Sequence, residues 1–141
     1  VTGNKREGDG ASPAGEFPFR RLVFRPDRIG AQELVTSLPA EPLQRDDGWC
    51  DDPASSAYNR PVKLPFDGSH EVMWRDDHLY DIVVILGQND TPPVPGLGSA
   101  IFMHLAKEDY APTEGCVAVS PEHMRLILQN IGNGAEMVIH A

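Results

Sequence analysis

The sequence predicts a mainly β domain with one short helix near its C-terminus. Glycine and proline contribute 13 residues each to a chain of 141, and so many turn-forming residues favour a β-rich domain over a helical bundle. The apolar runs are short and separated by turn residues, and only residues 120–131 place apolar side chains at helical spacing. The length fits a single domain over residues 1–141 that can bury a hydrophobic core.

The start of the chain is polar and rich in glycine, so residues 1–15 are expected to form a loop or a frayed terminus. Val1 stands where an initiator methionine would be, and no signal-peptide pattern precedes it. We therefore expect a processed or trimmed segment that does not carry its export signal. The next stretch, residues 17–25, alternates imperfectly between its two faces and predicts a strand, with Pro18 at an edge or at the beginning of the pairing. Residues 32–38 fit a helical turn or a strand equally well.

Residues 46–61 contain no periodic pattern and predict a long loop. Trp49 and Tyr58 favour partial burial with their polar tips bonded. The loop is then either a packed Ω-loop or one wall of a substrate cleft. In the second case its side chains suit an amine or a free carboxylate in the substrate. The candidate substrate-binding residues are Trp49, Asp51, Asp52, Asn59 and Arg60.

Three further strands are predicted in the second half of the chain, at residues 73–75, 80–87 and 99–105. The run from Ile82 to Leu86 is β-branched and apolar on both faces, so it is expected at the centre of a sheet that is covered on both sides. In the third of these strands the alternation places His104 on the same face as Phe102.

The predicted helix has a clear start and one apolar face. Ser120 is a good N-cap residue, and Pro121 suits the first helical position. The apolar stripe consists of Met124, Ile127, Leu128 and Ile131. A glycine at 132 or 134 ends the helix, and residues 136–140 predict a closing strand.

The charge balance excludes some classes of partner. Twelve basic and 21 acidic residues give a net charge of −9, which disfavours binding to nucleic acid or to an anionic membrane surface. No apolar run approaches the roughly 18 residues that a membrane span requires.

His104 and Cys116 carry the most specific chemical signal. The histidine ends one predicted strand, and the cysteine follows a polar loop at the start of the next apolar run. A thiol attacks as its thiolate, and a neighbouring imidazole is the usual means of lowering its pKa. Gly115 permits a sharp turn and a close approach, and such a turn can aim backbone N–H groups at an oxyanion. The pattern predicts a cysteine acyltransferase.

The same residues resemble a known family. The order histidine, loop and Thr113-Glu-Gly115-Cys116-Val117 is similar to the catalytic signature of L,D-transpeptidases of the YkuD type, in which Ser/Thr-x-Gly-Cys precedes an apolar residue. A second segment, from Lys5 to Pro18, resembles the family's Gly-x-x-Thr-Pro-x-Gly-x-Phe pattern, with Ser12 in place of threonine. Together the two segments bracket most of the chain.

The resemblance implies a fold and an activity. The expected fold is a mixed two-sheet β-sandwich with one short helix. The expected substrate is the stem peptide of bacterial peptidoglycan, cleaved between its diamino acid and the terminal D-alanine through a thioester. An amine on another stem would accept the acyl group, whereas water as acceptor would give an L,D-carboxypeptidase; the sequence leaves both open. The implied location is the periplasm or the cell wall.

The resemblance also assigns catalytic roles. Cys116 attacks the carbonyl and His104 transfers the proton. A backbone carbonyl in the loop between them orients the imidazole, the N–H groups of Gly115 and Cys116 meet the oxyanion, and Thr113 supports the loop. No cofactor and no metal is expected.

The chain departs from the family pattern at two positions. The family usually carries arginine, sometimes asparagine, two residues after the cysteine, where this chain has Ala118. The residue after the histidine is often glycine, and here it is Leu105. Arg60 or Arg125 are the candidates to replace the missing arginine.

Two alternatives use the same residues differently. A non-catalytic wall-binding module could join Cys50 and Cys116 in a disulfide, which exported proteins tolerate. A metal-dependent hydrolase could use His104 and Cys116 with Cys50 or an aspartate, although no close ligand pair of the Cys-x-x-Cys kind is present.

Overall fold

The computed structural model describes residues 1–141 and contains two β-sheets and one α-helix. The larger sheet has six strands in the order β2-β1-β6-β7-β8, and β9 also pairs with β1. The smaller sheet has the order β4-β3-β5. The strands of the larger sheet are β1 (Gly15–Phe24), β2 (Ala40–Pro42), β6 (Ile82–Leu86), β7 (Phe102–Leu105), β8 (Val117–Val119) and β9 (Glu136–Ile139), and those of the smaller are β3 (Asp47–Cys50), β4 (Pro61–Lys63) and β5 (His70–Val72). This confirms a mainly β fold with two sheets and one helix near the C-terminus.

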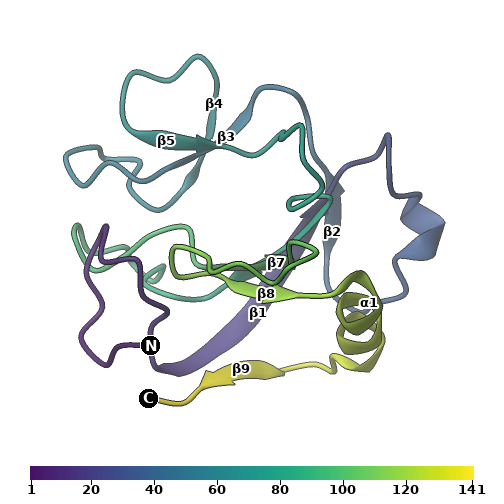
Figure 1. Cartoon of the computed structure of the whole chain (residues 1–141). Helices are drawn as coiled ribbons and strands as arrows, with labels where there is room; N and C mark the ends of the chain where they lie inside the picture. The colour runs from purple at the N-terminus through teal and green to yellow at the C-terminus, as the bar shows by residue number, and fades with distance from the viewer.

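The long strand β1 organises the larger sheet. Its first half pairs antiparallel with β9, and its second half lies between β2 and β6. Pro18, which has no N–H to donate, lies at the end of the β9 pairing opposite Glu136. In Figure 1 the small sheet lies above the larger one, and both chain termini lie at the same edge.

The helix α1 (Pro121–Asn130) forms as its sequence predicts. The Ser120 hydroxyl accepts a hydrogen bond from the N–H of His123 at 3.2 Å, which caps the first turn. Two residues of the helix, Met124 and Leu128, are fully buried in the hydrophobic cluster that the helix shares with the larger sheet. None of the helices has the length and apolarity that crossing a bilayer requires.

Two hydrophobic clusters cover opposite faces of the larger sheet. In β6, Ile82 and Val84 face the cluster that contains α1, whereas Val83 and Ile85 face the cluster that contains the small sheet. This strand is central and covered on both sides, as its composition predicts. In β7, Met103 faces α1 and Phe102 faces the small sheet. Because side chains alternate along a strand, His104 faces the small sheet together with Phe102.

The structure corrects two sequence-based expectations and decides between the alternatives of two others. Residues 46–61 are not a structureless loop, because they contain β3. Residues 73–75 form no strand, and the neighbouring strand β5 ends at Val72. Residues 32–38 contain only the end of a 3₁₀ turn, η1 (Ala31–Glu33). The first 14 residues form a loop, the first of the two expected alternatives, and the bridge between Thr2 and Pro13 shows that they are not frayed.

Candidate active site

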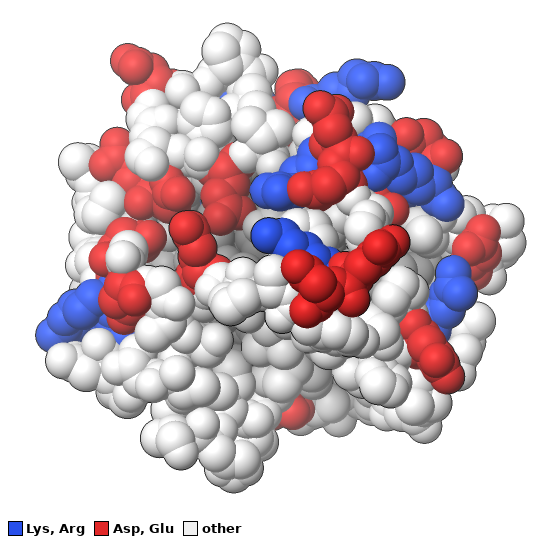
Figure 2. Space-filling view, in the orientation of Figure 1, with Lys and Arg blue, Asp and Glu red and all other residues white.

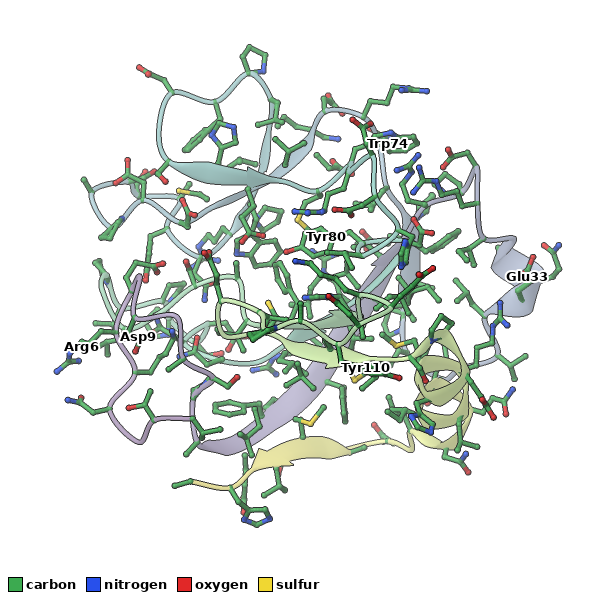
Figure 3. All side chains as sticks on the ribbon, in the orientation of Figure 1. Arg6, Asp9, Glu33, Trp74, Tyr80 and Tyr110 are labelled. Atoms are coloured by element: carbon green, nitrogen blue, oxygen red, sulfur yellow. The ribbon has the colours of Figure 1, made fainter.

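A pocket of about 490 Å³ lies between the two sheets, next to the ends of β7 and β8. Cys116, His104 and Thr113 all line it. Figure 3 shows Tyr80, another lining residue, at the centre of this region between the small sheet and the strands β7 and β8. The volume is within the range of pockets that bind small ligands.

His104 is a buried histidine with a defined orientation. It lies on β7, and its Nδ1 is 2.8 Å from the carbonyl oxygen of Leu105. A carbonyl can only accept, so Nδ1 carries the proton and Nε2 is left as a base. The orienting carbonyl is therefore that of the adjacent residue on β7 and not one in the following loop. Burial lowers the pKa of His104 below its usual range, and the charge of Arg75 adds to this.

Cys116 immediately precedes β8 and is only partly exposed. Its Sγ donates to the carbonyl of Ala100 at 3.3 Å, and no hydrogen bond joins this sulfur to His104. Burial, together with the nearby carboxylate of Glu71, raises the pKa of Cys116 to about 12. Burial thus disfavours both the thiolate of Cys116 and the imidazolium of His104, and the pKa of the thiol is shifted in the direction opposite to the one that an activating imidazole would give.

Gly115 and Thr113 shape the turn before the cysteine. Gly115 has a φ of 117°, and a Cβ at this position would lie 2.8 Å from the carbonyl oxygen of Ala11. Glycine at position 115 therefore allows the backbone of the cysteine turn to pack closely against the N-terminal loop. The Thr113 hydroxyl donates to the carbonyl of Cys116 at 2.6 Å and closes the turn. The backbone N–H groups of Gly115 and Cys116 have no partner within the chain.

The N-terminal loop is fastened to the wall of the pocket through Glu7. Its carboxylate accepts hydrogen bonds from the hydroxyls of Tyr58 and Ser99, and its backbone N–H donates to Gly96 at 2.9 Å. Because Glu7 and Gly10 line the pocket, this segment forms part of the site. The second family-like segment and the cysteine turn are therefore in contact.

Only one of the five candidate substrate-binding residues lines this pocket. Asp51 does, and its Oδ1 is buried without a hydrogen-bond partner. Trp49 and Asn59 are buried, and the indole N–H of Trp49 donates to the amide oxygen of Asn59 at 3.0 Å. Asp52 caps a turn by accepting from the N–H of Ala54. Arg60 is exposed and lies beside a separate depression.

Asn59 is a structural link between the two sheets. Its amide oxygen also accepts from the N–H of Ala100, and its amide nitrogen donates to the carbonyls of Gln88 and Asn89. All of its hydrogen-bonding capacity is thereby used within the protein.

Several charged and aromatic residues of the pocket were not predicted from the sequence. Glu71 accepts a hydrogen bond from the Tyr80 hydroxyl at 2.8 Å, and burial raises the pKa of this carboxyl. Arg75 and Lys107 also line the pocket. These residues come from β5, from the following connection and from the loop after β7, and no local pattern in the sequence brings them together. Figure 2 shows acidic and basic side chains mixed around the hollow on this face, whereas the lower part of the face carries few charges.

The other expectations can be placed on the structure as well. Arg125 pairs with Glu33 at 3.7 Å on the surface and does not line the pocket, so neither Arg60 nor Arg125 fills the place beside Ala118. Cys50 and Cys116 are both free thiols, which removes the disulfide from the alternative of a wall-binding module. No three His, Cys, Asp or Glu side chains converge to form a metal-ligand set.

Comparison with known proteins gives one match. The family model of the L,D-transpeptidase catalytic domain, YkuD, matches residues 1–139. No curated protein and no solved structure matches the chain.

Proposed function

Because the chain belongs to the L,D-transpeptidase catalytic domain family, we propose that it is a cysteine acyltransferase that acts on peptidoglycan stem peptides. The observation that carries the proposal is the pocket in which Cys116, His104 and the turn at Gly115 come together. The tautomer of His104 supports it, because the unprotonated nitrogen is the one that is not bonded to Leu105.

In the first half of the reaction the thiol of Cys116 attacks the carbonyl of the scissile amide. His104 accepts the thiol proton as the sulfur–carbon bond forms, so that no free thiolate has to exist beforehand. The free N–H groups of Gly115 and Cys116 stabilise the oxyanion. The carbon–nitrogen bond then breaks, and His104 returns the proton to the leaving amine. A thioester on Cys116 remains.

In the second half an amine of another stem peptide attacks the thioester. His104 accepts its proton, the new amide forms, and the proton returns to the sulfur as the carbon–sulfur bond breaks. The unpartnered oxygen of Asp51 supports binding of a substrate ammonium group. Thr113 holds the turn in place by its bond to the carbonyl of Cys116.

We further propose that residues 1–141 act as one catalytic domain in the periplasm or at the cell wall. A single domain is supported by the larger sheet, whose strands contribute to both hydrophobic clusters. An extracytoplasmic location is typical of the family.

The test is turnover of a stem tetrapeptide by the wild type and by Cys116→Ala. The wild type should release D-alanine, and it should form cross-linked product when an amine acceptor is present. Cys116→Ala should lose activity at least a thousandfold and keep its melting temperature, because the side chain is small and no stabilising network depends on it.

The matched control is Cys50→Ala, which removes the other cysteine from the core outside the pocket. This variant should retain turnover. Equal activity of Cys116→Ala and the wild type would reject the assigned nucleophile, and D-alanine release without any cross-linked product would favour hydrolysis over transfer.

A further inference from the structure

Three cationic side chains line the pocket, and one of them is held by fixed partners on the side of the small sheet. Lys5 pairs with Asp9 within the N-terminal loop, and Lys107 is exposed on the loop after β7. Arg75 donates from Nε and Nη2 to the two carboxylate oxygens of Asp77, at 2.9 and 2.6 Å. Its guanidinium lies 5.1 Å from the centre of the Tyr80 ring. Arg75 is thus positioned before any ligand binds.

The guanidinium of Arg75 retains donors that the protein does not use. Nη1 has no hydrogen-bond partner within the chain, and the side chain is 40% exposed. A planar guanidinium with free N–H groups suits a carboxylate better than an ammonium does. The pair with Asp77 reduces the entropy that binding would cost, because the side chain is already ordered.

Arg75 lies on the same side of the pocket as the proposed base. The Tyr80 ring, which Arg75 contacts, is 5.3 Å from the ring of His104. The charge of Arg75 also contributes to the lowered pKa of His104. The strand partner of His104 is Ala118, whose small side chain leaves this part of the pocket open.

The chemistry of the proposed reaction indicates what a cation at this position would meet. His104 must protonate the nitrogen of the leaving terminal residue. In an α-amino acid that nitrogen and the carboxylate are attached to the same carbon, so a group beside His104 faces the carboxylate of the leaving residue.

We propose that Arg75 binds the terminal carboxylate of the donor peptide and thereby selects donors with a single residue beyond the scissile bond. The inference rests on the proposed function and extends it to the specificity of the same site. An exposed C-terminus is the feature that distinguishes such a donor from a longer stem.

The test compares two donors, a tetrapeptide with a free C-terminal carboxylate and the same peptide with a C-terminal amide. The wild type should prefer the free acid roughly ten- to a hundredfold in kcat/KM, the range of a charge-assisted hydrogen-bonded pair. Arg75→Ala should lose that factor on the free acid, mainly through KM, so that the variant turns over the acid and the amide with similar kcat/KM. Arg75→Lys, which keeps the charge without the planar fork, should retain part of the preference.

The control variant is Arg125→Ala, which removes a surface arginine outside the pocket. Its kcat/KM should equal that of the wild type for both donors. An equal loss on both donors in Arg75→Ala, or a wild type without preference, would overturn the role of Arg75. Acylation of Cys116 by a β-lactam, measured by mass spectrometry, distinguishes a failure of the role of Arg75 from a failure of the proposed function. If the Arg75→Ala variant is acylated and still prefers the free acid as the wild type does, only the role of Arg75 is contradicted. A wild type that is not acylated and turns over neither donor overturns the proposed function as well.

Discussion

At the scale of single residues, candidate reacting groups are easier to recognise in the sequence than their protonation is to predict. His104 and Cys116 stand out in the sequence because of their order and the loop between them. Their ionisation depends on burial, since low polarity disfavours both a thiolate and an imidazolium. The groups that cause these shifts come from parts of the chain remote in sequence: the Tyr80 ring packs near His104, and the charge of Glu71 acts on Cys116. A sequence pattern carries no information about it.

A neutral resting pair makes a specific prediction for alkylation of Cys116. The thiol is protonated below its pKa of about 12, so reactivity should appear as the pH rises. The rate with iodoacetamide should increase about tenfold per pH unit between pH 7 and 10, without the plateau that an ordinary cysteine with a pKa of about 8.5 shows.

The measurement is the initial rate of alkylation, read by mass, with Cys116→Ala giving the background from the buried Cys50. Unfolded protein supplies the reference for an unperturbed thiol. A native rate that is already at its plateau near neutral pH would mean that a thiolate–imidazolium pair exists at rest.

At the scale of elements, patterns with local causes were predictable. The capped helix α1 and the apolar central strand β6 follow from capping chemistry and from side chains that alternate between two buried faces. The short strands of the small sheet were missed, because three or four residues carry too little periodicity. Their pairing partners lie on other parts of the chain, so tertiary contacts decide the conformation.

The turn at Gly115 is the element on which the site depends most directly. An alanine there would have to adopt a φ of 117° and would place its Cβ 2.8 Å from the carbonyl oxygen of Ala11. Gly115→Ala should therefore lower the free energy of unfolding by about 1–3 kcal/mol. It should also slow acylation, because the N–H groups that we propose as oxyanion donors move with the turn.

Thermal unfolding and the acylation rate check this prediction. Gly132→Ala is the matched control, because no atom lies within 4 Å of a Cβ at that glycine and its φ is not left-handed. Melting temperatures and rates that are the same for the two variants would show that the turn tolerates a side chain.

At the scale of the whole molecule, the site is assembled from segments far apart in the chain. The N-terminal loop reaches the pocket through Glu7, and β5 contributes Glu71. His104 lies on β7, and Cys116 immediately precedes the neighbouring strand β8. The resemblance to a family predicted the fold and pointed to the N-terminal segment and the cysteine turn, which both line the pocket. The middle of the pocket could not be predicted, and Trp49 and Asn59, chosen for their chemistry, belong to the core instead.

The most direct test of the central claim is the intact mass of the native protein after exposure to a carbapenem. We predict one covalent adduct per chain, located on Cys116 by peptide mapping and absent from Cys116→Ala. An adduct on Cys50, or none in a wild-type protein shown to be folded, would contradict a nucleophilic role for Cys116.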